Sequence, residues 1–129
     1  MSESEASGAA RSRGAGVKPR MMRRPEEFEA VLRSRIRSVS RNFVARARPN
    51  DFDHPRLGII AGRKAAARAV DRNRAKRLIR EAFRAAGERA GAYDIAVQLK
   101  SDLRGEDNAA LRKELDALLD TLLRETRRA

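Results

Sequence analysis

The sequence predicts an α+β fold in which helices pack on one small mixed sheet as a two-layer sandwich. Apolar and polar residues alternate from Tyr93 to Leu99, which is typical of a strand. Apolar residues recur at steps of three and four from Ala75 and again from Leu111, which is typical of amphipathic helices. The expected order is therefore helix, two or three strands, helix, strand, helix.

The sandwich is expected to occupy residues 21–129, after a disordered basic tail at residues 1–20. Serine, glycine, alanine and arginine dominate the start of the chain, so that it has too little apolar surface to offset the entropy lost on ordering. The whole sequence of 129 residues has room for one domain with a modest core.

A short helix is expected to begin at Pro25, because proline suits the first helical position and the two glutamates after it place negative charge in the first turn. Phe28, Val31 and Leu32 then share one face of this helix. An aromatic residue at helical spacing is more often part of a core than a binding platform, so the pattern alone favours a core role for Phe28.

Polar and small apolar residues alternate in residues 34–48, which predicts two short strands joined near residues 38–40. The side chains expected to point inward are Ile36 and Val39 in the first strand and Phe43 or Val44 in the second. After a loop rich in proline, asparagine and aspartate, residues 56–62 (RLGIIAG) are expected to form a short buried strand.

The second helix is expected to have Asp71 as its N-cap and to end between Gly87 and Gly91, where glycines punctuate the chain. The last helix is expected to open with Asp107 or Asn108 as its cap. The apolar stripes of the two helices consist of Ala75, Leu78, Ile79, Ala82, Phe83 and Ala86, and of Leu111, Leu115, Leu118, Leu119 and Leu122.

Residues 63–84 (RKAAARAVDRNRAKRLIREAFR) are the most basic part of the chain, with nine basic and two acidic residues, or +7 of a formal net charge of +12. The side opposite the apolar stripe carries Asn73, Arg77, Arg80 and Arg84, flanked by Arg74 and Lys76. Charged helix faces are usually only solvated, but such faces normally mix signs. Here cations also crowd the helix start, where the macrodipole disfavours them, and a polyanion would compensate. The segment therefore predicts nucleic-acid binding.

Protein-borne catalysis and metal binding find little support in the sequence. His54 is the only histidine and there is no cysteine, which excludes a standard zinc cluster, a catalytic pair and any disulfide. Two acidic sets, in residues 51–53 and 102–107, lie in turn-like segments where aspartate is favoured for structural reasons. There is no Walker loop and no G-x-G-x-x-G. No catalytic residue, metal ligand or small-molecule substrate is predicted.

No apolar run approaches the length of about 20 residues that crosses a membrane, and the N-terminus lacks a secretory apolar core. We therefore expect a cytoplasmic protein without a membrane partner.

The order R-L-G, then R-K, then D-R-N-R-A-K-R-L-I-R-E-A-F resembles the bacterial ribonuclease P protein subunit, whose hallmark is an R-N-R-x-K-R-x-x-R-x-x-F helix. The match covers most of the chain from about Arg24, with HPRLG ahead of the basic helix and Y-D-I-A-V after it. The resemblance implies a fold of the ribosomal protein S5 domain 2 type, α-β-β-β-α-β-α, with a left-handed βαβ crossover. Pattern reasoning alone favours the usual right-handed crossover.

The resemblance also implies a function. Family members form a one-to-one ribonucleoprotein with a large RNA that removes the 5′ leader from precursor tRNA by endonucleolytic hydrolysis, with magnesium at the RNA active site. The chain is thus expected to be a ribonuclease P subunit in tRNA processing whose own side chains are not catalytic. The residues that would bind the RNA subunit are Arg63, Lys64, Arg68, Arg72, Asn73, Arg74, Lys76, Arg77, Arg80 and Arg84.

In the family, a cleft between the first helix and the sheet holds the precursor leader. The residues carried over to this cleft are Phe28, Leu32, Phe43 and Arg46. The two phenylalanines would stack on unpaired bases. Leu32 and Arg46 each stand where other members have an aromatic residue, so the cleft is expected to rely more on charge and less on stacking.

Two other functions fit the same residues. One is a ribosomal or tRNA-binding protein without a role in cleavage, which the co-purifying RNA would identify. The other is a protein-only nuclease that uses one of the acidic sets as metal ligands, which would cut precursor tRNA without any RNA subunit.

Overall fold

The structure, a computed structural model, describes residues 19–129. The helices are α1 (Pro25–Leu32), α2 (Ala69–Ala86) and α3 (Asn108–Arg128), with a short 3-10 turn, η1 (Gly87–Ala90), after α2. The strands are β1 (Arg37–Val39), β2 (Phe43–Pro49), β3 (Arg56–Ile60) and β4 (Tyr93–Leu99). The predicted order of helices and strands is confirmed.

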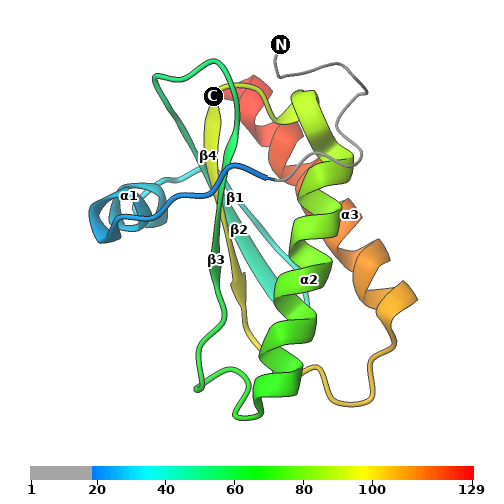
Figure 1. The fold of residues 1–129 in the computed structure, drawn as a ribbon. Coiled ribbons are helices and arrows are strands. Elements are labelled where there is room, and N and C mark those ends of the chain that lie inside the picture. Colours follow the sequence, from blue (N-terminus) through cyan, green and yellow to red (C-terminus); the bar gives the residue numbers. More distant parts are fainter. Residues whose placement is uncertain (1–18) are drawn as a thin grey trace.

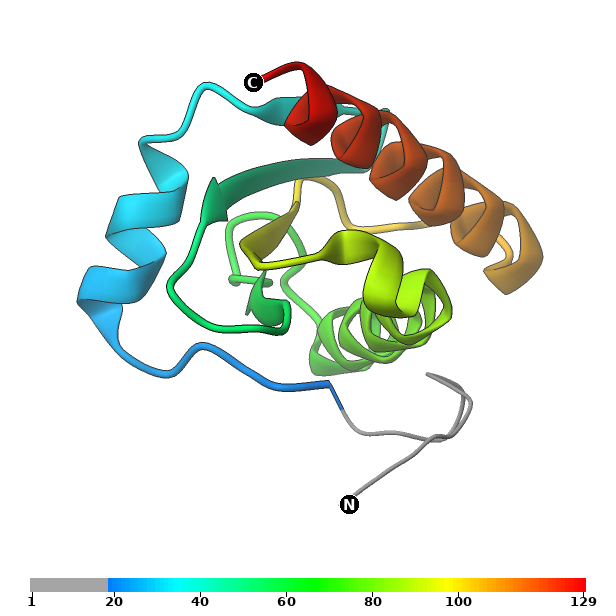
Figure 2. The ribbon, with the colours of Figure 1, turned by 90° about the horizontal axis from the view of Figure 1, so that it is seen from above.

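One mixed sheet organises the molecule, with the strand order β1-β2-β4-β3. β3 and β4 are parallel neighbours joined by α2, whereas β1–β2 and β2–β4 are antiparallel pairs. Figures 1 and 2 show that α2 and α3 cover one face of the sheet and that α1 lies against the other. The two views also show that the path from β3 through α2 to β4 turns with the left hand that the resemblance implies.

The described chain begins along the outer edge of the sheet. Leu57 N–H donates to the Arg20 carbonyl at 2.7 Å, and Met22 N–H donates to the Leu57 carbonyl at 2.8 Å. Residues 20–22 therefore cover β3, which would otherwise be an open edge. The rest of the expected tail, residues 1–18, lies outside the described residues.

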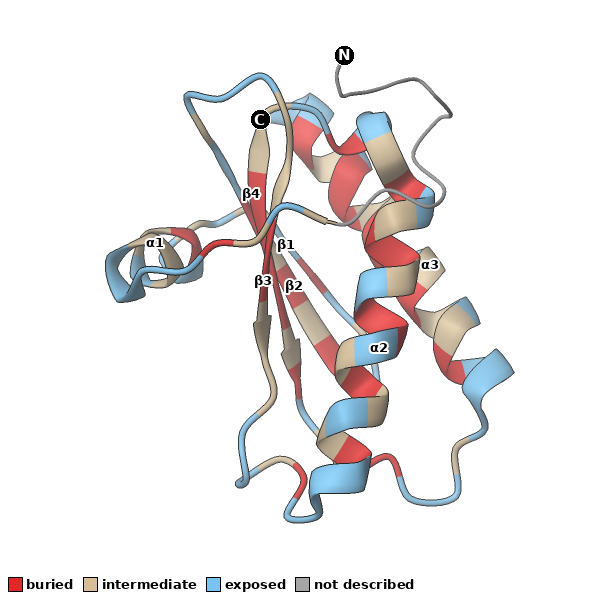
Figure 3. Ribbon diagram, viewed as in Figure 1, coloured by how far each residue is buried: buried red, intermediate tan, exposed pale blue. Residues whose placement is uncertain are grey.

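The main core lies between the sheet and the two long helices. All the predicted stripe residues of α2 and α3 are buried in it, and Figure 3 shows the exposed positions of both helices turned outward. The alternation from Tyr93 to Leu99 is confirmed as β4. Both faces of this strand are nevertheless covered, because Ala96 packs with Met22 and Val31 under α1.

The prediction for the first strand was wrong by one residue. Val39 is 55% exposed, and Ser38 is the buried residue of β1. Ser38 pairs with Ala45, which lies in the main core, so Val39 and its partner Val44 take the opposite face. A shift of one residue exchanges the faces of a strand, and a three-residue strand with a polar centre has too weak an apolar pattern to fix them.

The helix starts were predicted with mixed success. Asp107 is the N-cap of α3 and accepts from Ala110 N–H at 2.7 Å, as expected. Asp71 is not the cap of α2, since the helix begins at Ala69 and Arg68 occupies the cap position. The expected glycine stop is confirmed, because Gly87 and Gly91 have φ of 55° and 62°.

Gly58 allows α1 to close on the sheet. A Cβ atom at this position of β3 would lie 2.5 Å from the terminal methyl of Met22 and 2.6 Å from the ring of Phe28. Only glycine therefore lets the Phe28 ring rest directly on the strand.

Candidate nucleic-acid interface

Three loops and two helix starts meet at one end of the sheet. The carboxyl ends of the parallel strands β3 and β4 meet there, followed by residues 61–68 before α2 and residues 100–107 before α3. The β1–β2 turn joins them, because Phe43 at the start of β2 pairs with Leu99 at the end of β4. The first turns of α2, where the basic residues gather, therefore lie beside these loops.

The outer side of α2 is the predicted cationic face. Asn73, Arg77 and Arg80 are exposed, and Lys76 and Arg84 are partly exposed beside them. Arg77 has one acidic neighbour, Glu81, at 3.8 Å. Within residues 19–129 no carboxylate forms an ion pair with Arg80 or Lys76. Arg80 and Lys76 therefore present positive charge on the outer side of α2, as the sequence predicted.

Arg63 and Lys64 extend this charge into the loop before α2, where both are exposed. We call the set formed by Arg63, Lys64, Lys76, Arg77 and Arg80 the α2 basic surface. Its members come from a loop and from successive turns of one helix, so that they can meet several phosphates of a folded polyanion at once.

Arg68 has a local partner at the helix start. Its Nε and Nη2 atoms donate to the Asp71 carboxylate at 2.9 and 3.2 Å. These hydrogen bonds from Arg68 are the main reason that the pKa of Asp71 is lowered. Asp71 is buried in the first turn of α2, so its charge also offsets part of the crowding of cations there.

Arg72 and Arg74 do not extend outward with the rest of the row. Arg72 Nη1 donates to the carbonyls of Ala66 and Ala67 at 2.9 and 2.8 Å. Arg74 donates to acceptors in the segment between β4 and α3. Both guanidinium groups, which the resemblance assigns to RNA binding, are therefore engaged by acceptors of the protein itself.

Three further cations at this end of the sheet were not predicted. Lys100 and Arg104 are exposed in the loop before α3, and Arg41 is exposed in the β1–β2 turn. Lys100 Nζ donates to the Ser40 carbonyl at 3.0 Å, which ties the two loops together. The pairing of the strands explains these positions, which sequence patterns alone do not show. Lys100 and Arg104 follow β4, which is parallel to β3, and Arg41 precedes Phe43, which pairs with Leu99.

The second predicted site, the cleft beside α1, is only partly assembled. Phe28 is partly buried over Gly58, and Leu32 is 36% exposed at the end of α1. Arg46 lies on the same side, because it pairs with Ala96 under α1. Phe43 does not belong there: it is fully buried in the main core on the other face of the sheet. The expectation that Phe43 stacks on bases was wrong, since strand alternation separates it from Arg46.

Arginines take the place of aromatic residues on this face. Arg37 of β1 pairs directly with Arg46 of β2, and no carboxylate within the described residues forms an ion pair with either. Like charges directly across two strands are unfavourable without an anion between them. Beside them lie Val39 and Val44, which pair in the same register. The face thus combines a cationic pair with a small apolar strip.

A buried ionic network holds α1 against the sheet. Arg56 donates to both carboxylate oxygens of Asp94 at 2.8 Å and to Glu27 at 2.7 Å. The second Glu27 oxygen accepts from the Arg23 and Arg24 backbone N–H groups at 3.0 Å. Hydrogen bonds from Arg24 N–H and then from the Arg56 guanidinium lower the pKa of Glu27 to about 2. The network fixes α1 against the strands β3 and β4, and sequence patterning did not reveal it.

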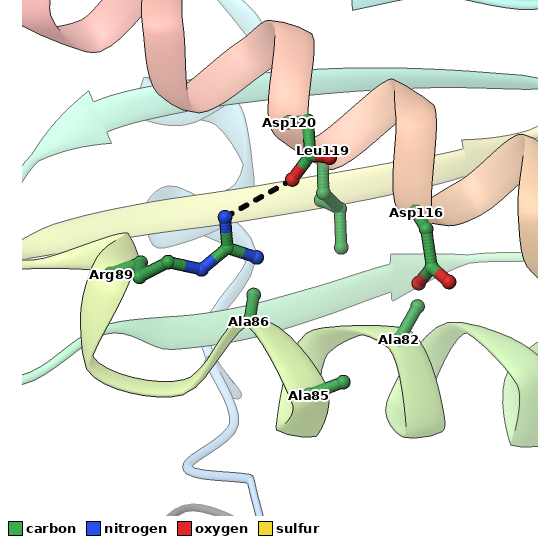
Figure 4. A pocket seen from close by; sticks show the side chains of 7 residues that line it. All are labelled: Ala82, Ala85, Ala86, Arg89, Asp116, Leu119 and Asp120. Atoms are coloured by element: carbon green, nitrogen blue, oxygen red, sulfur yellow. Dashed lines mark hydrogen bonds and ion pairs between the residues drawn. The ribbon is translucent and has the colours of Figure 1, made fainter.

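Three other features of residues 19–129 concern metal binding, membranes and cavities. In residues 19–129 there is no group of three or more acidic, histidine or cysteine side chains that could hold a metal ion. None of the helices in this range is long and apolar enough to cross a membrane. Figure 4 shows a groove of about 250 Å³ between α2 and α3, lined by alanines and by the Arg89–Asp120 ion pair. Its lining includes no residue of the α2 basic surface.

Known proteins are similar to this sequence over most of its length. The family model described as Ribonuclease P matches residues 17–123. The ribonuclease P protein component of Idiomarina loihiensis is 41% identical over 95 residues, which is 73% of this chain and 76% of the relative. The ribonuclease P protein component of Stutzerimonas stutzeri is 40% identical over 114 residues, which is 88% of this chain and 86% of the relative.

Solved structures share the fold. The RNase P protein of Staphylococcus aureus superposes with a TM-score of 0.71 at 28% identity, over 80% of this chain and 94% of that one. The RNase P protein from Thermotoga maritima, solved in complex with 1-(4-fluorophenyl)-2-thiourea, gives 0.67 at 30% identity, over 80% and 97%. Family model, relatives, fold and basic helix agree, and the chain belongs to the ribonuclease P protein family.

Proposed function

We propose that this ribonuclease P protein binds the large RNA subunit through the α2 basic surface and assists that RNA in removing the 5′ leader of precursor tRNA. One observation carries the proposal: the outer side of α2 presents Lys76, Arg77 and Arg80, and within residues 19–129 only Glu81 forms an ion pair with any of them. A row of this kind gains affinity for folded RNA by releasing condensed counterions.

The cleft beside α1 is the proposed seat of the precursor leader. Phe28 and Leu32 supply apolar contact, while the Arg37–Arg46 pair supplies charge for phosphates. This face lies on the opposite side of the sheet from α2. One molecule can therefore contact the RNA subunit and the unpaired leader at the same time, in a one-to-one particle.

The magnesium ions needed for cleavage are bound by the RNA in this proposal. They are held by RNA phosphates and not by side chains of the protein. The cations of α2 would reduce the repulsion among phosphates gathered at the active centre, which would strengthen magnesium binding and substrate docking. In this role the protein acts in the cytoplasm.

Reconstitution tests the proposal. The purified full chain is added to a bacterial ribonuclease P RNA transcript, and leader removal from precursor tRNA is followed as magnesium is lowered. We expect the protein to sustain cleavage at magnesium concentrations where the RNA alone fails. Binding without any effect on cleavage would favour a tRNA-binding or ribosomal protein, and cleavage by the protein alone would favour a protein-only nuclease.

A further inference from the structure

Two arginines of the basic helix point to the protein rather than to solvent. Arg72 and Arg74 flank Asn73, and their guanidinium groups are engaged by backbone carbonyls of two different loops. We propose that Arg72 and Arg74 are positioning residues, which hold the loops on either side of the α2 basic surface, and that they are not themselves phosphate contacts. This inference rests on the proposed RNA-binding function, but its first test does not need RNA.

Arg74 joins α2 to the start of α3 with all three of its side-chain nitrogens. Nε donates to Asn108 Oδ1 at 2.7 Å, Nη1 donates to the Leu103 carbonyl at 3.4 Å, and Nη2 donates to the Glu106 carbonyl. Charge-assisted hydrogen bonds of this kind are about twice as strong as neutral ones. A guanidinium used on three acceptors has few donors left for a phosphate.

The loop that Arg74 holds contains a strained residue. Leu103 has a φ of 63°, a backbone conformation that residues other than glycine rarely adopt, and its side chain is buried in the core. Its carbonyl accepts from Glu106 N–H at 3.2 Å as well as from Arg74. Such a conformation persists only where several contacts fix it, and Arg74 supplies one of them.

Arg72 performs the equivalent task on the other loop. Its Nη1 atom donates to the carbonyls of Ala66 and Ala67, which lie just before the start of α2 at Ala69. The loop held in this way carries Arg63 and Lys64, and the loop held by Arg74 carries Lys100 and Arg104. The exposed cations of these two loops are therefore positioned by two partly buried arginines of α2.

Lysine substitution separates the two roles. Lysine keeps the positive charge, so it should preserve a simple phosphate contact. It cannot reproduce the planar fork that reaches several acceptors in fixed directions. Arg77 is the matched control, because it lies one turn from Arg74 on the same helix and is half exposed.

The first experiment is amide hydrogen exchange on the free full-length protein. In Arg74→Lys we expect amides of residues 101–107 to exchange about tenfold faster, the effect of losing roughly one charge-assisted hydrogen bond. In Arg72→Lys the same change is expected in residues 63–68. Amides of β4 report whether each variant remains folded, and Arg77→Lys should leave both loops unchanged. Unchanged amide exchange rates in residues 63–68 of Arg72→Lys and in residues 101–107 of Arg74→Lys would overturn the proposal.

The second experiment measures binding to a bacterial ribonuclease P RNA transcript across a salt series. We expect Arg74→Lys to weaken binding as much as Arg74→Gln does. We also expect Arg74→Gln to have a smaller effect when Arg104→Gln is already present, because Arg74 and Arg104 act through the same loop. Arg124→Lys changes an exposed arginine near the far end of α3, outside both proposed sites, and should bind like the unaltered chain. Full rescue by lysine at position 74, with losses that add to those of Arg104→Gln, would show a direct phosphate contact instead. If the unaltered chain fails to bind the transcript, the proposed function fails, while the exchange result still decides the role of the arginines.

Discussion

The ion pair between Arg56 and Asp94 gives the sharpest test of how the sheet and α1 are held together. Arg56→Ala would leave the Asp94 carboxylate, whose side chain is 4% exposed, without its two guanidinium hydrogen bonds. Removing one partner of a buried pair destabilises a protein by about 3–5 kcal/mol, because the other charge stays buried. The substitution also removes the contact to Glu27 and the packing of the guanidinium at 4.5 Å from the Phe52 ring centre.

A matched control is available on the opposite side of the molecule. Arg89 and Asp120 form an ion pair at 3.1 Å, with side chains that are 56% and 48% exposed. Exposed pairs of this kind contribute less than about 1 kcal/mol, so Arg89→Ala should have little effect. Urea unfolding followed by circular dichroism gives the free energy of unfolding for both variants. Equal losses for Arg56→Ala and Arg89→Ala would refute the argument that burial makes the Arg56 network important.

Three further changes follow from the same structure. Gly58→Ala should displace Phe28, since the new methyl lies about 0.8 Å inside ordinary contact distance of the ring. We expect the free energy of unfolding to fall by about 1–3 kcal/mol. We also expect the variant to lose more affinity for a precursor with a long leader than for one without a leader. The lowered pKa of Glu27, about 2 against an ordinary 4.5, adds stability that is present above pH 4.5 and is lost as the pH falls toward 2; acid titration of unfolding should therefore be shallower in Glu27→Gln. Arg46→Gln should reduce the salt dependence of leader binding by about one phosphate contact and leave binding of the RNA subunit unchanged, as measured by filter binding with each RNA.

Patterning was sufficient where one face of an element is apolar over several turns. The stripe from Ala75 to Ala86, the alternation of Tyr93 to Leu99 and the leucines of α3 each occupy the expected element and the expected face. The Asp107 cap was also predictable, because capping depends on residues within one turn. These parts of the fold are set by local sequence.

Patterning failed where the decisive partner is distant in sequence. Nothing local shows that Phe43 lies in the main core, because both Phe43 and Val44 are apolar and only the pairing with Leu99 and Gln98 selects the face. Arg74 has its acceptors about 30 positions later, and Arg56 is fixed by Asp94 from a neighbouring strand. A basic helix read alone therefore overstates the number of cations that are available to RNA.

The central claim is that the outward cations of α2 bind folded RNA. It is tested most directly by comparing the salt dependence of binding to ribonuclease P RNA for two double variants with the same change in charge. Arg77→Gln with Arg80→Gln removes two members of the α2 basic surface, whereas Arg124→Gln with Arg127→Gln removes two exposed arginines near the far end of α3. We expect the slope of log K against log salt to fall by about two for the α2 pair and to stay unchanged for the α3 pair. Equal slopes for the two double variants would contradict the claim.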